Sequence, residues 1–270
     1  MLFRSNNPYN CSYAELFEGG LTITTTLDTR LQDAAEQACA EQYASMAEGL
    51  DASLVAMDPR TGYVQALVGG QDYETDQWNI ATQGGRPAGS AFKVFTLVTA
   101  IEQGISPQTR IDCSNPYRLP NGTTIENFDS IDYRVRSIQS ATAVSANTGY
   151  YRLAEKVTPS SIIQTAHKMG ITSNLANLPI ITLGTENVTP LEMTAAYSTL
   201  ASGGIQRDPV IITKIENAEG EVLYETEDTG ERVIEEEVAG ATTKVLRQVF
   251  ESSEGICQRS EERRVGKECR

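Results

Sequence analysis

The sequence has few of the groups on which metal, nucleic-acid and membrane proteins depend. It has one histidine, and its cysteines form no Cys-x-x-Cys or histidine-linked pattern, so a zinc site is disfavoured. The longest apolar runs, such as 94–101, are far below the ~20 residues that a membrane helix requires. Thirty-six acidic residues face 22 basic ones, a net charge of −14 with no basic stripe to track phosphates. We therefore expect no metal, no cofactor and no nucleic-acid partner.

The single histidine also narrows the kinds of catalysis. His167 lies in the segment 166–170, which is typical of a helix end, and we expect it to be a satisfied surface position. A Ser-His-Asp triad is thus nearly excluded. With 270 residues, 40% of them hydrophobic, the chain is long enough for one large domain or two small ones with a substantial core.

The two ends differ in composition from the middle. Residues 1–20, rich in Asn, Ser, Tyr and Gly, are predicted to be a linker, and no signal-peptide pattern follows Met1. Residues 259–270 look like the translation of a sequencing adapter, so we expect the natural sequence to be cut near Gln258; a genuine basic tail is the alternative. Two disulfides or four free thiols are equally compatible with the cysteines that remain, which are Cys11, Cys39, Cys113 and Cys257.

Apolar periodicity and turn residues predict strands and helices in alternation. The predicted elements are a strand at 21–27, a helix from an Asp28 N-cap to about 49, a hairpin at 53–57 and 63–68, helices through 135–141 and 151–157, a helix through 193–200, and a second hairpin at 210–215 and 222–224. Thr189-Pro-Leu-Glu192 combines a capping box with proline at the first helical position. No element is predicted in the polar stretch 106–132. The acidic run 235–237 favours a solvated helix start.

A serine and a lysine stand three positions apart where a glycine- and proline-rich approach gives way to an apolar helix. Ser90 and Lys93 follow Gly84, Pro87 and Gly89. Residues i and i+3 share one face of a helix, so the hydroxyl and the amine can meet, and a neutral lysine could accept the serine proton. The alternative is an ordinary N-cap serine followed by a solvated lysine.

Ser90-Ala-Phe-Lys93, followed by Ser145-Ala-Asn147, resembles the motifs of the penicillin-binding protein and serine β-lactamase superfamily. Within it, residues 15–250 are most similar to the transpeptidase domain of class A penicillin-binding proteins. The strings that carry this likeness are Asp58-Pro-Arg-Thr-Gly62, Val68-Gly-Gly70, Arg86-Pro-Ala-Gly-Ser90, Glu126-Asn127 and Leu183-Gly-Thr-Glu-Asn-Val-Thr-Pro-Leu-Glu192, with Gly203-Gly204 and, upstream, Thr24-Thr-Thr-Leu-Asp28.

The resemblance implies a role for each motif residue. Ser90 would be the acylated nucleophile and Lys93 its general base, with the Ser90 backbone N–H in the oxyanion hole. Ser145 would relay a proton to the leaving amine, and Asn147 would hold Lys93 and the substrate backbone. The implied reaction is D,D-transpeptidation of D-alanyl-D-alanine stem peptides of peptidoglycan, and β-lactam antibiotics would acylate Ser90 instead.

The resemblance also implies a fold and a location. The expected fold is α+β, an antiparallel sheet packed with helices plus a mostly helical subdomain, with the sheet incomplete in this chain. A transpeptidase domain would occupy residues 21–258. The site would lie outside the cytoplasmic membrane, and contact with that membrane would come only through an anchor and a glycosyltransferase upstream of Met1. Tyr73 and Trp78 could line the cleft, but packing under a loop is the preferred interpretation.

One motif of the family is absent. No lysine of the chain is followed by Thr-Gly or Ser-Gly. Holding Lys93 neutral near pH 7 takes about three pKa units, roughly 4 kcal/mol, and a helix N-terminus supplies at most about 2 kcal/mol. The rest should come from burial and a second cation, which the missing lysine supplies in the family. We therefore expect this chain to be weakly active or inert. The alternatives are a serine β-lactamase or penicillin-sensor domain, and a non-catalytic scaffold on the same fold.

Overall fold

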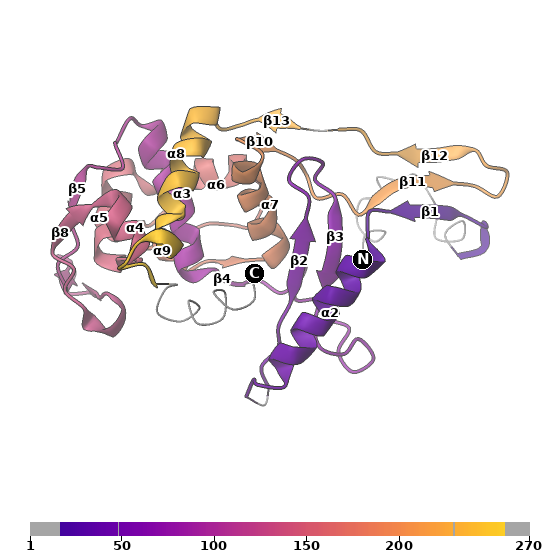
Figure 1. Ribbon diagram of the computed structural model, residues 1–270, viewed down its shortest axis with the longest axis horizontal. Helices are drawn as coiled ribbons and strands as arrows, with labels where there is room; N and C mark the ends of the chain where they lie inside the picture. The colour runs from indigo at the N-terminus through magenta and orange to yellow at the C-terminus, as the bar shows by residue number, and fades with distance from the viewer. Residues whose placement is uncertain (1–16, 48, 229, 257–270) are drawn as a thin grey trace. The chain divides into compact units, whose positions relative to one another are not determined.

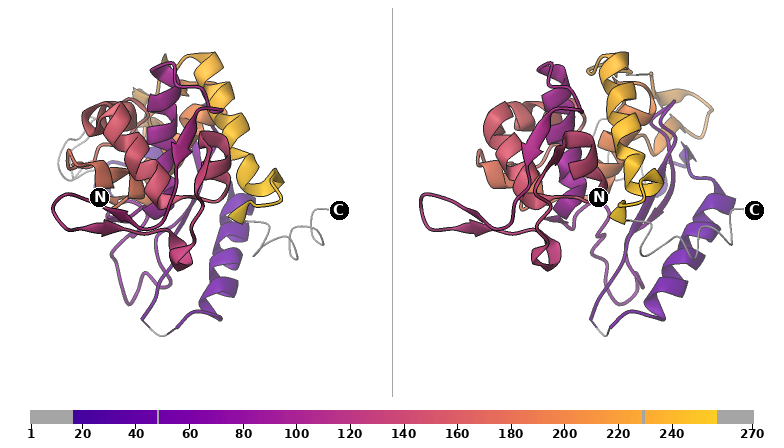
Figure 2. Two further views of the ribbon diagram at one scale, coloured as in Figure 1. Left: turned by 90° about the vertical axis from the view of Figure 1, so that its left-hand side faces the viewer. Right: turned by 60° about the vertical axis from the view of Figure 1, so that its left-hand side comes forward.

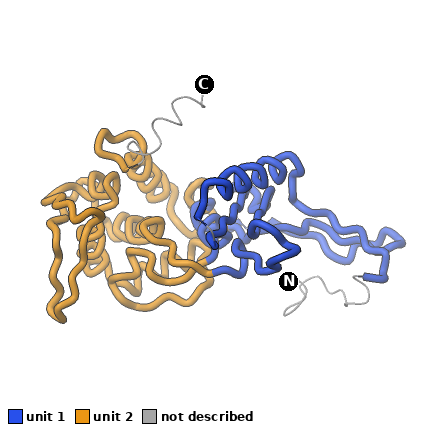
Figure 3. The backbone as a smooth tube through the Cα atoms, turned by 90° about the horizontal axis from the view of Figure 1, so that it is seen from below, with its two compact units in different colours: residues 1–84, 189–198, 207–231 blue, residues 85–188, 199–206, 232–270 orange. Residues whose placement is uncertain are grey.

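The computed structural model describes residues 17–47, 49–228 and 230–256 of the chain. The expectations for Cys11, Cys257, the adapter-like segment 259–270 and most of the linker fall outside these residues. The chain divides into two compact units, which are described separately: unit 1 comprises 1–84, 189–198 and 207–231, and unit 2 comprises 85–188, 199–206 and 232–270 (Figure 3). Within the described residues, every helix is too short or too polar to cross a bilayer.

Unit 1 contains a three-stranded antiparallel sheet in the order β1-β11-β12 (Figure 1). Its strands are β1 (Thr22–Thr25), β11 (Ile212–Glu216) and β12 (Val222–Glu225), which match the predicted strand and second hairpin. The turn between β11 and β12 is closed by the Asn217 side chain, whose Oδ1 accepts the N–H groups of Glu219 and Glu221. Ile212 and Ile215 of β11 are buried, with Leu21 and Tyr224 packed against them.

The second sheet of unit 1 is the predicted hairpin of β2 (Leu54–Met57) and β3 (Val64–Val68), covered by α2 (Thr29–Tyr43). Asp28 caps α2 as predicted, because its Oδ1 accepts the N–H groups of Arg30 and Leu31. The helix ends at Tyr43 rather than near residue 49. The inner face consists of small side chains, Ala35, Cys39, Ala66 and Val68, which lets the helix pack directly on the hairpin.

Unit 2 is built around α3 (Lys93–Glu102), which packs against α5 (Asn147–Val157), α6 (Pro159–Lys168) and α8 (Glu236–Leu246) (Figure 2). Residues 93–100 of α3 are all buried, including the polar Lys93, Thr96 and Thr99. Shorter helical segments complete the unit: η1 (Gly89–Phe92), η2 (Phe128–Ser130), α4 (Ile138–Ala143), η3 (Pro179–Leu183) and α9 (Gln248–Glu251).

Helix α7 (Pro190–Ala201) begins with the predicted capping box. The Thr189 N–H donates to Glu192 Oε2 over 2.7 Å, and the Glu192 N–H donates to Thr189 Oγ1 over 3.1 Å. The helix is followed by Gly203 and Gly204, both at positive φ. The acidic segment 235–237 does begin α8, with Glu235 at the N-cap position.

Several short strands were missed by the sequence analysis. Unit 2 pairs β4 (Arg86–Pro87) with β9 (Asn187–Val188), β5 (Arg110–Asp112) with β8 (Val135–Ser137), and β6 (Tyr117–Arg118) with β7 (Thr124–Ile125); β10 (Ile205–Gln206) and β13 (Glu231–Arg232) are equally short. Val135 thus begins a strand, not the predicted helix. The helix starts only at Ile138, because the Ser137 hydroxyl caps it by accepting the Ser140 N–H.

Candidate active site

The serine and lysine of the first motif lie on consecutive helical turns. Ser90 is inside the 3-10 turn η1, which runs directly into α3 at Lys93. Ser90 is exposed, whereas the Lys93 side chain is buried, with a relative exposure of 5%. The Lys93 Nζ lies 3.1 Å from Ser90 Oγ. The alternative of an N-cap serine with a solvated lysine is therefore wrong, since no side chain caps η1 and the lysine is buried.

A glycine contact holds this turn in place. Gly89 has φ +58° and donates its N–H to the Gly184 carbonyl over 3.1 Å. A Cβ on Gly184, itself at φ +66°, would overlap the Gly89 backbone. The backbone before Ser90 therefore packs so closely against Gly184 that position 184 has no room for a side chain.

The second motif meets Lys93 from the junction of α4 and α5. Lys93 Nζ lies 2.7 Å from the Ser145 carbonyl, 2.8 Å from Ser145 Oγ and 2.7 Å from Asn147 Oδ1. Ser145 has φ +52°, a conformation that non-glycine residues rarely adopt and that often marks functional sites. This turn lets one residue present both its carbonyl and its hydroxyl to the lysine. The structure therefore brings together all four residues that the sequence singled out.

The orientation of the Asn147 amide follows from its partners. Its Nδ2 donates to the Glu126 carbonyl over 2.9 Å, so the oxygen end faces Lys93. The Ser145 carbonyl and Asn147 Oδ1 can only accept hydrogen bonds, and a neutral amine has two N–H groups. When both are given to these oxygens, the nitrogen lone pair is left for a hydroxyl of Ser90 or Ser145. The arrangement suits a base that accepts a serine proton.

Burial lowers the pKa of Lys93 to about 7, and only an ionised Cys113 thiolate would oppose this by raising it. The Tyr150 ring lies 5.6 Å from Nζ and occupies another side of the amine. From the sequence we expect a second cation, in addition to burial, to lower the pKa of Lys93. Among the described residues, burial alone is the cause that lowers this pKa, and it brings the neutral form of Lys93 within reach near neutral pH.

Sequence reasoning missed the groups beneath the site. Cys113 is fully buried, and burial raises the pKa of its thiol to about 11, so it stays protonated and is no competing nucleophile. Glu126 and Asn127 were noted only as part of the family resemblance. In the structure the Glu126 carbonyl contacts Asn147, and Asn127 is buried with a relative exposure of 4%.

The other residues considered have no place in this cluster. His167 lies near the end of α6 with its Nδ1 2.7 Å from the Ile171 carbonyl, which confirms the expected satisfied helix-end position. Tyr73 and Trp78 are exposed, by 68% and 55%, so the preferred interpretation that they pack under a loop is wrong. Among the described residues, no group of three His, Cys, Asp or Glu side chains could hold a metal.

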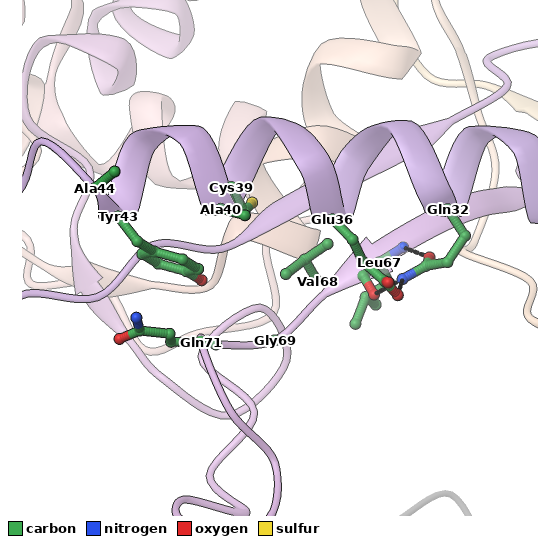
Figure 4. A pocket seen from close by; sticks show the side chains of 11 residues that line it. Gln32, Glu36, Cys39, Ala40, Tyr43, Ala44, Leu67, Val68, Gly69 and Gln71 are labelled. Carbon is green, nitrogen blue, oxygen red and sulfur yellow. Dashed lines mark hydrogen bonds between the residues drawn. The ribbon is translucent and has the colours of Figure 1, made fainter.

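A cavity of about 720 Å³ lies in unit 1 between α2 and β3 (Figure 4). It contains the Cys39 thiol and the Tyr43 phenol. Burial raises the pKa of both groups, that of Tyr43 to about 12, and the phenol donates to the Ala52 carbonyl over 2.7 Å. Both groups therefore stay protonated near neutral pH. None of the four motif residues lines this cavity, so we assign no chemistry to it.

Comparison with known proteins identifies the family of the site. The family model described as the penicillin binding protein transpeptidase domain matches residues 52–266. Over 254 residues the chain is 34% identical to penicillin-binding protein 1A of Mycolicibacterium smegmatis, covering 87% of this chain and 32% of that protein. Over 238 residues it is 32% identical to penicillin-binding protein 2D of Bacillus subtilis, covering 86% and 34%. The chain thus spans about a third of the length of these curated relatives.

A solved structure of a penicillin-binding protein has a similar fold. The PonA1 protein from Mycobacterium tuberculosis, determined in complex with penicillin V, matches with a TM-score of 0.79 and 31% identity over 88% of this chain and 66% of that one. The expected α+β fold is therefore confirmed.

Proposed function

Since the chain belongs to the penicillin-binding protein transpeptidase family, we propose that it carries the acylation centre of a peptidoglycan D,D-transpeptidase. The observation that carries this proposal is the contact between the exposed Ser90 hydroxyl and the buried amine of Lys93, 3.1 Å apart. The pKa of about 7 makes that amine available as a base near neutral pH, where an ordinary lysine is almost wholly charged.

The reaction follows from these positions. Ser90 Oγ attacks the carbonyl carbon of the penultimate D-alanine of a stem peptide while its proton passes to Lys93 Nζ. The terminal D-alanine leaves as the C–N bond breaks, and Ser145 Oγ, 2.8 Å from Nζ, passes a proton to its amine. An amine of a neighbouring strand then attacks the acyl-serine ester: the new C–N bond forms as the C–O bond to Ser90 breaks, and the proton that the amine loses passes through Lys93 Nζ to Ser90 Oγ. A β-lactam would open its ring on Ser90 by the same first step, without a leaving fragment.

The setting of this reaction is part of the proposal. We place the transpeptidase domain at residues 21–258, outside the cytoplasmic membrane, in a parent protein that an upstream segment anchors. Nascent glycan strands or lipid-linked stem peptides would supply both partners. Because the chain has no Lys-Thr/Ser-Gly, we expect it to be acylated more slowly than a relative that has this motif.

Mass spectrometry of the chain after incubation with benzylpenicillin tests the proposal. We expect a mass gain equal to the whole antibiotic, located on the peptide that contains Ser90. The gain should be absent in Ser90→Ala and unchanged in Ser160→Ala, an exposed serine on α6 of the same unit. No adduct even at long incubation, or an adduct on another residue, would refute the acylation centre in this chain.

The fate of the adduct separates the candidate activities. A persistent adduct, together with release of D-alanine from a peptide ending in D-alanyl-D-alanine, supports a transpeptidase. Rapid loss of the adduct as hydrolysed penicillin would instead indicate a β-lactamase. Labelling at the rate of a relative that has Lys-Thr/Ser-Gly would contradict the expected impairment.

A further inference from the structure

The side chain of Asn127 makes hydrogen bonds in every direction that an amide allows. Its Nδ2 donates to the Cys113 carbonyl over 3.1 Å and to the Ile131 carbonyl over 2.9 Å. Its Oδ1 accepts from the backbone N–H of Thr148 over 3.1 Å and from the Thr148 hydroxyl over 3.2 Å. Two donors and two acceptors are all that an asparagine amide has. The orientation of this buried side chain is therefore fixed.

One of these bonds completes a helix that lacks its own cap. Helix α5 begins at Asn147, and its N-cap residue, Ala146, has no side-chain oxygen that could accept a backbone N–H. The first N–H groups of a helix have no partner within it, and an N-cap side chain commonly accepts the N–H of the second or third helical residue. Asn127 accepts that of Thr148, the second residue, from a separate loop. It thereby takes the place of the missing cap.

The residue before Asn127 reaches the catalytic cluster directly. The Glu126 carbonyl accepts from Asn147 Nδ2 over 2.9 Å, and Asn147 Oδ1 lies 2.7 Å from Lys93 Nζ. The backbone N–H of Asn127 is also held, by Asn115 Oδ1 over 2.7 Å. The peptide that joins Glu126 to Asn127 is thus fixed on both sides. Its position decides which end of the Asn147 amide faces the lysine.

We propose that Asn127 is a positioning residue for the acylation reaction: it caps α5 from outside and, through the Glu126 carbonyl, keeps the Asn147 oxygen on Lys93. This inference rests on the proposed function, although the contacts that carry it do not. Asparagine suits the position because an aspartate would turn an oxygen toward the carbonyls of Cys113 and Ile131, and alanine would leave the Thr148 N–H without its acceptor.

Three variants test the proposal. Asn127→Ala removes all four side-chain bonds. Thr148→Val keeps the shape of the side chain and the backbone N–H, and removes only one bond to Asn127. The matched control is Thr165→Val, which removes a buried hydroxyl bonded to Thr99 and Glu102, away from the cluster in the same unit. Urea unfolding of each variant shows how much of any change is loss of stability.

The first measurement is the pH titration of Lys93, monitored by NMR of the chain with ¹³C-labelled lysine. The Lys93 signal is identified as the one that is missing in Lys93→Met. Burial is what lowers the pKa of Lys93 to about 7, and the titratable groups placed beside it are Cys113 and Tyr150. Freeing the start of α5 admits water at the segment that covers the amine. We expect the Lys93 midpoint to rise toward its ordinary value in Asn127→Ala, to rise less in Thr148→Val, and not to move in Thr165→Val.

The second measurement is the rate of Ser90 acylation by benzylpenicillin. We expect it to fall about tenfold or more in Asn127→Ala, since small displacements of reacting groups cost up to 10²-fold, and to stay unchanged in Thr165→Val. A Lys93 titration identical to that of the unaltered chain in folded Asn127→Ala would overturn the proposal. If that variant does not fold, the same result in Thr148→Val decides. If the unaltered chain is not acylated, the proposed function fails in this chain, and the Lys93 titration still decides the role of Asn127.

Discussion

Raising the pH from 7 to 9 should stabilise the folded chain through Lys93. The pKa of this lysine is about 7 in the folded state against an ordinary value of 10.5, so the unfolded chain binds more protons between these two values. Stability rises with pH wherever the unfolded state binds more protons. The contribution of Lys93 is therefore least favourable below pH 7, and its penalty disappears as the pH approaches 10.5.

The size of the effect follows from the two pKa values. Each unit of difference corresponds to about 1.4 kcal/mol, so the full penalty of keeping Lys93 in its buried site is roughly 5 kcal/mol below pH 7. Between pH 7 and pH 9 about 2 kcal/mol of this penalty is removed. No discount for solvent screening applies, because the side chain is only 5% exposed.

The comparison of the unaltered chain with Lys93→Met isolates this effect. Methionine leaves the Ser145 carbonyl and Asn147 Oδ1 without a donor, but that loss is the same at both pH values. Cys113, whose pKa is raised from 9.0 to about 11, makes stability fall mainly above pH 9, so most of its effect lies outside the range compared. Urea unfolding should be followed by circular dichroism, because the single tryptophan, Trp78, lies in unit 1 and would not report on unit 2.

We expect the free energy of unfolding to rise by about 2 kcal/mol more in the unaltered chain than in Lys93→Met between pH 7 and 9. Equal pH dependence in the two proteins would show that the folded lysine keeps its ordinary pKa. In that case the reasoning from burial to a neutral base is refuted.

Three further substitutions test separate parts of the structure. Gly184→Ala should destabilise unit 2 by about 1–3 kcal/mol and slow acylation, because its Cβ overlaps the Gly89 backbone; Gly104→Ala, at a similar φ of +77° with open space around it, is the control and should cost less. Thr242→Val should stabilise the chain by up to about 1 kcal/mol, since Thr242 Oγ1 is buried without a partner among the described residues, and a measured loss of stability would contradict this. Ser145→Ala should lower D-alanine release by about 10²-fold or more, as expected when a proton relay is removed; an unchanged rate would exclude that role.

Local signals in the sequence predicted most of the longer elements. The Asp28 cap and the Thr189–Glu192 capping box are bonds between neighbours in the chain, so their residue types alone identify them. The pairing of β5 with β8 joins Arg110 to Ser137, and nothing in either short segment shows that the other will be its partner. The sequence predicted a helix through 151–157 and a helix end at 166–170, but not α6 between them, because an apolar pattern does not reveal the backbone turn at Thr158, with φ +75°.

The residues of the candidate site were predictable in part, as the helices and strands were. The spacing of Ser90 and Lys93 made a contact possible, because residues three apart share one face of a helix, but it left an N-cap serine with a solvated lysine as the alternative. Ser145 and Asn147 are 52 and 54 positions from Lys93, and only the family resemblance connected them to it. The role of Asn127 could not be predicted from the sequence, because its partners come from three separate segments of the chain.

The pH dependence of Ser90 acylation tests the central claim most directly. If a neutral Lys93 removes the serine proton, the rate of benzylpenicillin attachment should be half-maximal near pH 7 and fall about tenfold for each pH unit well below it. A rate that keeps rising through pH 9, or that does not depend on pH between 5 and 9, would contradict the account.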